Sequence, residues 1–180
     1  MATIKPNKCE IGFSDQFFFD TNVWLLLYGT IADFQKDDQK AYAKFLENLI
    51  SRNAPIYITS MVVSEFANVL IKKEYNSWKT NNPNISNKFK LDFVPTTQYA
   101  NTVSTISILI KKIIKLPNLQ LIGDDFNAID KSNILNNFKI VDFNDAYIYQ
   151  LAILNKYKIV TNDKDFQKLS SSIDIITTQC

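Results

Sequence analysis

Short apolar runs alternate with segments of helical periodicity along most of this chain, and this alternation restricts its fold more than any other feature. We expect the apolar runs to form strands at residues 17–19, 56–59, 119–122, 158–161 and 173–177. Helices are expected directly after residue 20 and at residues 35–52, 60–71, 97–115, 126–137 and 145–157. This order of elements favours an α/β fold, a three-layer α/β/α sandwich around a mainly parallel central sheet. The length favours a single domain over residues 1–180.

Polar residues that could cap helices stand ahead of three of the predicted helices. Thr21 or Asn22 follows the first strand, Ser60 follows the second, and Asn144 precedes the helix that is expected to begin at Asp145. Their side-chain oxygens can accept hydrogen bonds from the free amides of a first helical turn. We therefore expect these residues to be the N-caps.

The segment between residues 72 and 93 differs in composition from its surroundings. It is rich in Asn, Lys and Ser, and it contains Pro83. Trp78, Phe89 and Phe93 give it apolar anchors, so we interpret it as an Asn/Lys-rich excursion from the core rather than a linker.

The residue types that the chain lacks exclude several kinds of catalytic site. It contains no histidine, which removes Ser-His-Asp and Cys-His triads and every zinc site that needs histidine. Two cysteines, Cys9 and Cys180, are too few for a four-ligand zinc site. Because they show no spacing pattern, they favour a protein of the reducing cytoplasm, and a disulfide between them is the alternative. The three glycines, Gly12, Gly29 and Gly123, lie too far apart in the sequence to form a dinucleotide fingerprint or a P-loop. No segment approaches the ~20 apolar residues of a membrane span, so we expect a cytoplasmic protein. The groups that remain available for catalysis are carboxylates, hydroxyls, lysines and a hard metal ion.

Four acidic residues occupy positions where a parallel sheet places its ligand site. Asp20 and Asp163 each follow a predicted strand, and Glu65 and Asp145 lie near the starts of predicted helices. Strand carboxyl ends and the N-termini of the following helices share one edge of such a sheet, so these acids can converge. Each has an ordinary alternative as a helix-dipole, capping-box or turn residue. Asp20 fits such an alternative least, because it lies in an apolar stretch where an unpaired charge is costly.

Four short motifs carry these acids in chain order. They are Asp20-Thr21-Asn22, Ser64-Glu65-Phe66-Ala67, Asp145-Ala146-Tyr147-Ile148 and Thr161-Asn162-Asp163-Lys164-Asp165-Phe166. The set resembles the motifs of PIN-domain ribonucleases, most closely the VapC-type toxins of toxin–antitoxin pairs, from about residue 17 to residue 176. The resemblance implies metal-binding catalytic acids at Asp20, Glu65, Asp145 and Asp163, with Asn22, Thr161 and Asp165 as supporting polar groups. Asp142 competes with Asp145, which is preferred because the alanine-bearing helix follows it directly.

The activity that the resemblance implies is cleavage of single-stranded or structured RNA by a metal-dependent endoribonuclease. Carboxylate oxygens suit Mg²⁺ or Mn²⁺, either of which activates water and neutralises phosphodiester charge. The implied partners are an RNA substrate, a cognate antitoxin protein and a second copy in a homodimer, with no membrane. Lys72, Lys73 and Lys79, close to Trp78, are candidate RNA contacts, although a solvated helix face is the favoured interpretation of them.

Two other functions compete with this interpretation. The first is a catalytically degenerate PIN-like module that binds RNA or acts as a scaffold, against which the four intact acids argue. The second is an aspartate-based phosphohydrolase, since Asp20 ends a strand. That chemistry usually has a second acid two positions later, where this chain has Asn22.

Overall fold

A computed structural model describes residues 2–29, 35–83, 86, 88–169 and 172–179, and its described strands form one parallel sheet. The spatial order is β1-β6-β5-β2-β3-β4, and every pairing is parallel. The strands are β1 (Thr3–Ile4), β2 (Phe17–Phe19), β3 (Ile56–Thr59), β4 (Leu119–Ile122), β5 (Lys158–Val160) and β6 (Ile175–Ile176). The predicted α/β fold with a mainly parallel sheet is therefore confirmed.

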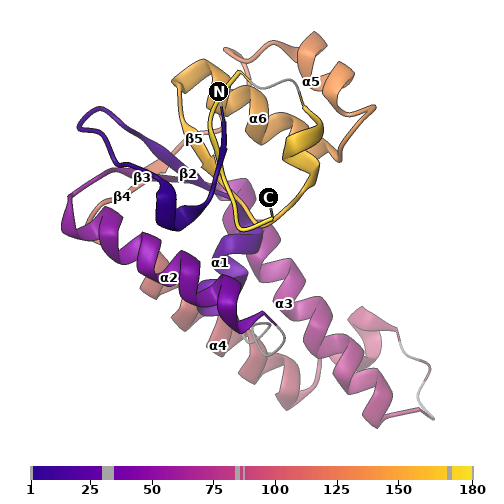
Figure 1. Cartoon of the computed structure of the whole chain (residues 1–180). Coiled ribbons are helices and arrows are strands. Elements are labelled where there is room, and N and C mark those ends of the chain that lie inside the picture. The colour runs from indigo at the N-terminus through magenta and orange to yellow at the C-terminus, as the bar shows by residue number, and fades with distance from the viewer. Residues whose placement is uncertain (1, 30–34, 84–85, 87, 170–171, 180) are drawn as a thin grey trace.

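Helices cover the sheet in two groups (Figure 1). The first group packs together and consists of α1 (Thr21–Tyr28), α2 (Lys36–Ser51), α3 (Ser60–Asn81) and α4 (Thr97–Ile114). The second group consists of α5 (Lys131–Asn137) and α6 (Phe143–Asn155), which pack on each other. Shorter helical turns are η1 (Pro6–Lys8), η3 (Phe89–Phe93) and η4 (Asp165–Lys168).

The central strand β2 is held by aromatic packing and determines where the site begins. Its three phenylalanines are fully buried. Phe17 meets Phe45 of α2 edge to face, with ring centroids 5.6 Å apart, and Phe19 packs on Trp24 at 5.1 Å. The indole of Trp24 also donates a hydrogen bond to the Phe19 carbonyl at 3.2 Å. Burial of each such side chain stabilises the fold by roughly 1.5–3 kcal/mol, so the backbone that leads into residue 20 is firmly placed.

The three predicted N-caps are wrong, each by one or two residues. Asp20 caps α1 by accepting the Thr21 amide, and Thr59, not Ser60, caps α3. Asp142, not Asn144, caps α6 through the Asp145 amide. Adjacent polar residues have similar capping ability, so the choice among them depends on where the chain leaves the strand, which tertiary packing decides.

The segment at 72–93 begins as a continuation of α3, which ends only at Asn81. The far ends of α3 and α4 project beyond the sheet as an arm (Figure 1). Trp78 and Phe93 are buried there, with ring centroids 5.4 Å apart, and Tyr99 of α4 packs on Phe93 at 5.5 Å. Residues 84, 85 and 87, and Cys180, lie outside the described residues. Among the described helices, none is long and apolar enough to cross a membrane.

Candidate functional site

Asp20 lies where β2 ends and α1 begins, and it is only 4% exposed. One carboxylate oxygen accepts the Thr21 amide at 2.6 Å, and the other accepts the Thr161 hydroxyl at 2.9 Å. Burial raises the pKa of Asp20 to about 7, against the opposing effect of these two hydrogen bonds. The nearby charges of Glu65 and Asp163 contribute to this rise, so Asp20 lies among other acids.

Thr161 connects three of the predicted site residues through one hydroxyl. This fully buried side chain donates to Asp20, accepts the Asp163 amide at 2.9 Å and accepts the Asn22 side-chain amide at 3.2 Å. The hydroxyl therefore uses its single donor and both acceptor positions. The structure thus brings the predicted supporting residues Thr161 and Asn22 into contact with the acids.

Glu65 extends from the second turn of α3 toward the start of α1. Its Oε2 accepts the Thr21 hydroxyl at 3.0 Å and the Asn144 side-chain amide at 3.2 Å. Thr21 therefore supports two acids, Asp20 through its amide and Glu65 through its hydroxyl. Neither Thr21 nor Asn144 was predicted to support acids; both were expected only as helix caps.

Asp145 lies in the first turn of α6 and is 8% exposed. Within the described part of the chain, its carboxylate accepts no hydrogen bond and forms no ion pair. Burial raises the pKa of Asp145 to about 8, and the charges of Asp20, Asp142, Asp163 and Glu65 add to this rise in that order. A nearly buried carboxylate in this setting is destabilised when ionised, unless a cation binds.

Asp163 follows β5 in a turn and is half-buried. Its Oδ1 accepts the Asp165 amide at 2.8 Å, which leaves lone pairs free for another ligand. The predicted supporting residue Asp165 is directed elsewhere, because its carboxylate pairs with Lys168 at 2.6 Å.

The four acids lie at one edge of the sheet, and burial together with the charges of the other three raises the pKa of Asp145. We refer to Asp20, Glu65, Asp145 and Asp163 as the acidic tetrad. No ion pair among the described residues includes a member of it. All of its donor atoms are carboxylate oxygens, the ligand type that Mg²⁺ and Mn²⁺ prefer, so the residues fit such an ion. In the described ranges, no group of three or more His, Cys, Asp or Glu side chains is arranged closely enough to hold a metal ion.

Asp142 accepts the backbone amide of Asp145 at 2.9 Å, and the predicted RNA-contacting lysines lie along α3. Asp142 is exposed and caps α6. Lys72 and Lys73 are exposed on α3, and Lys79 lies over the Tyr75 ring at 5.0 Å from its centroid. At a helical rise of about 1.5 Å per residue, Lys79 is roughly 21 Å along the helix from Glu65. Only RNA that extends along α3 would contact both.

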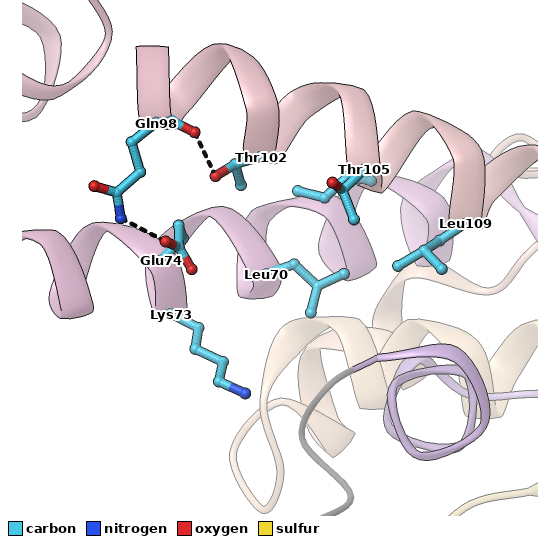
Figure 2. A pocket seen from close by; sticks show the side chains of 8 residues that line it. Leu70, Lys73, Glu74, Gln98, Thr102, Thr105 and Leu109 are labelled. Atoms are coloured by element: carbon cyan, nitrogen blue, oxygen red, sulfur yellow. Dashed lines mark hydrogen bonds between the residues drawn. The ribbon is translucent and has the colours of Figure 1, made fainter. Parts of the chain in front are cut away.

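A pocket of about 230 Å³ lies on the arm rather than at the acidic tetrad (Figure 2). It is formed between α3 and α4, where Gln98 donates to Glu74 at 2.5 Å and Leu70 and Leu109 supply apolar walls. Figure 2 also shows the Lys73 side chain directed away from α4. None of the four acids lines this pocket.

Comparison with known proteins identifies a family and similar solved structures, two of which are described below. The family model for the PIN domain matches residues 17–171. No curated protein sequence matches the chain significantly. The structure of VapBC2 from Rickettsia felis, bound to a DNA fragment from their promoter, is similar with a TM-score of 0.53 and 17% identity, covering 90% of this chain and 98% of that chain. The structure of PAE2754 from Pyrobaculum aerophilum is similar with a TM-score of 0.47 and 13% identity, covering 89% of this chain and 84% of that chain. At these identities the structural likeness concerns the fold alone.

Proposed function

The chain belongs to the PIN domain family, as its four motifs predicted, and on that premise we propose that it is a metal-dependent endoribonuclease. Members of this family are generally nucleases. In this proposal the acidic tetrad holds Mg²⁺ or Mn²⁺, and the substrate is single-stranded or structured RNA. The protein acts in the cytoplasm.

The environment of Asp145 is the observation that carries the proposal. Its carboxylate is 8% exposed, accepts no hydrogen bond from the described residues and lies within the electrostatic influence of the other three tetrad acids. A residue kept for stability alone would have a hydrogen-bond donor or a cation beside it. A bound divalent cation would give the Asp145 carboxylate the partner that it lacks and would offset the repulsion among the acids.

Hydrogen bonds from neighbouring residues orient two of the four acids. Thr161 and Thr21 fix the orientation of Asp20, and Thr21 and Asn144 fix Glu65. Such hydrogen bonds orient the carboxylates before an ion binds, so the side chains lose less conformational freedom on binding. When bound, the ion supplies charge neutralisation at the phosphodiester and lowers the pKa of a water molecule. No protein imidazole is required, which suits a chain without histidine.

A role as the toxin of a toxin–antitoxin pair is the second part of the proposal. It rests on the resemblance of the four motifs to VapC-type toxins, and the VapBC2 neighbour has the same fold. The proposed partner is a cognate antitoxin protein, and self-association into a homodimer is a further expectation. The test is coexpression with the product of an adjacent small gene, followed by size-exclusion chromatography of the two chains. Separate elution would contradict the antitoxin partnership without bearing on cleavage.

The nuclease proposal is tested by RNA cleavage with matched variants on α6. Asp145→Asn is expected to abolish cleavage in Mg²⁺ or Mn²⁺. Asp142→Asn is the control, because Asn caps helices as well as Asp does, and its activity should remain near that of the wild type. EDTA should stop the wild-type reaction. Full cleavage in EDTA, by a preparation free of other nucleases, would refute the metal mechanism. RNA binding without cleavage in any divalent ion would favour the degenerate binding or scaffold module.

A further inference from the structure

The turn that carries Asp163 is attached to a buried tyrosine more than a hundred positions away in the sequence. Tyr42 of α2 is fully buried, and its hydroxyl donates to the Thr161 carbonyl at 2.6 Å. The same hydroxyl accepts the Thr178 amide at 3.1 Å. One side chain therefore connects α2, the start of the turn and the segment that follows β6.

Asn162 attaches the next residue of the turn in two directions. Its side-chain oxygen accepts the Thr178 hydroxyl at 2.7 Å and the Gln179 side-chain amide at 3.1 Å. Its backbone amide donates to the Asn22 side chain at 2.8 Å, close to Asp20. The two residues immediately before Asp163 are thus held on both sides.

These contacts exceed what the sheet itself needs. The ladder between β5 and β6 is already continued by the Thr161 amide, which donates to the Ile176 carbonyl at 3.0 Å. The additional bonds restrain the peptide between residues 161 and 162 and the direction in which the chain enters Asp163. Carboxylates that bind a metal ion depend on such supporting contacts for their orientation.

From this arrangement we infer that Tyr42, Asn162 and Thr178 form a latch that positions the Asp163 carboxylate for the metal ion. The inference rests on the proposed function, since it assumes that Asp163 is a ligand. Tyr42 and Asn162 are positioning residues, because among the described residues their hydrogen bonds go to other groups than the tetrad carboxylates. The latch acts on ion binding rather than on the RNA directly.

The test compares two buried tyrosines that each accept a backbone amide from the C-terminal part of the chain. Tyr42→Phe removes the latch hydroxyl. Tyr149→Phe is the control, because the Tyr149 hydroxyl accepts the Ser172 amide at 3.2 Å and has no described contact with the turn. Binding of Mn²⁺ alone is measured by electron paramagnetic resonance of the free ion. We expect the dissociation constant to rise about tenfold or more in Tyr42→Phe, and to stay unchanged in Tyr149→Phe.

Two further measurements separate positioning from stability. Both variants should lose thermal stability, whereas only Tyr42→Phe should need more Mn²⁺ for half-maximal cleavage, with the affinity for RNA in EDTA unchanged. Thr178→Val is the milder variant if Tyr42→Phe does not fold. It removes the 2.7 Å bond to Asn162 and should weaken Mn²⁺ binding in the same direction.

The possible failures are distinguishable. Wild-type affinity for Mn²⁺ in both Tyr42→Phe and Thr178→Val, with normal affinity in the control, would overturn the latch and leave the proposed function intact. Equal weakening in the Tyr149→Phe control would also overturn it, because the effect would then reflect general loosening. Failure of the wild-type protein to bind Mn²⁺ would overturn the proposed function, and the latch with it.

Discussion

Replacing Asp20 with Asn is expected to stabilise the metal-free protein at pH 8 while abolishing cleavage. Asp20 is buried, and its pKa rises from 3.8 to about 7. Each unit of that rise is worth about 1.4 kcal/mol, so the ionised carboxylate costs the fold about 4 kcal/mol relative to the protonated one. Asparagine carries no charge and therefore avoids this cost.

The gain is reduced by what asparagine cannot do. Its single oxygen can accept the Thr21 amide and keep the cap of α1, but its amide nitrogen cannot accept the Thr161 hydroxyl. A hydrogen bond to a charged group contributes roughly 1.5–3 kcal/mol, which leaves a net stabilisation of about 2 kcal/mol at pH 8. In a chain of this length, that corresponds to a rise in melting temperature of roughly 4–8 °C.

The sign of the effect depends on pH. Because the pKa of Asp20 is higher in the folded state than in the unfolded state, the folded protein holds more protons between about pH 4 and pH 7. The stability contribution of Asp20 is therefore present at low pH and is lost as the pH rises through this window. At pH 5 the wild-type carboxyl is mostly protonated, and the two proteins should melt at similar temperatures.

Differential scanning fluorimetry at pH 5 and pH 8, in EDTA and in Mn²⁺, measures these differences. Mn²⁺ should raise the melting temperature of the wild type and that of Asp20→Asn much less. Asp165→Asn is the control, since Asp165 pairs with Lys168 at the surface and the exposed pair is worth at most about 1 kcal/mol. A variant that is less stable than the wild type at pH 8, or a difference of the same size at both pH values, would refute the reasoning.

Two further predictions concern the support of the site and the arm. Thr161→Val removes the hydroxyl between Asp20 and the Asp163 amide. It should lower cleavage strongly and reduce the free energy of unfolding by roughly 1–3 kcal/mol in a urea melt. Unchanged activity would contradict the role of Thr161 in supporting the acidic tetrad. Trp78→Ala should destabilise the arm by roughly 3–5 kcal/mol, because Trp78 is buried against Phe93, and should leave the affinity for Mn²⁺ unchanged. Limited proteolysis measures the first effect and Mn²⁺ titration the second. Weakened Mn²⁺ binding would show that the arm and the site are coupled.

Five of the six described strands were predicted, because they are short, apolar and bounded by turn signals, whereas the N-terminal strand β1 was missed. The continuous Phe17–Phe19 run was predicted to be a buried strand, and β2 has those bounds. The last strand was harder: it was expected at 173–177, whereas β6 is Ile175–Ile176, because apolar residues beside a strand also pack without joining its ladder. The continuation of α3 through 72–81 was missed because its polar composition concealed it. The absence of Pro or Gly before Pro83 was the available signal.

The acids of the candidate site could be placed from the sequence more easily than the residues that contact them. Each acid stands at a strand end or helix start, so local sequence is enough to place it at the correct edge. Tyr42 contacts Thr161 across 119 positions, and Asn144 contacts Glu65 across 79. Such pairs leave no local signal, because only the folded chain brings them together.

The order of strands also determines when the site can exist during protein synthesis. β2 lies between β3 and β5, and Thr161, which supports Asp20, is 141 positions further along the chain. A ribosome that has released the chain only as far as α5 therefore holds Asp20 and Glu65 without Asp145, Asp163 or β5. Pairings between such distant segments also form late and slowly in folding. If the chain is the nuclease proposed above, this topology keeps it inert while its nascent chain is surrounded by ribosomal and messenger RNA, and its site can form only as translation nears its end.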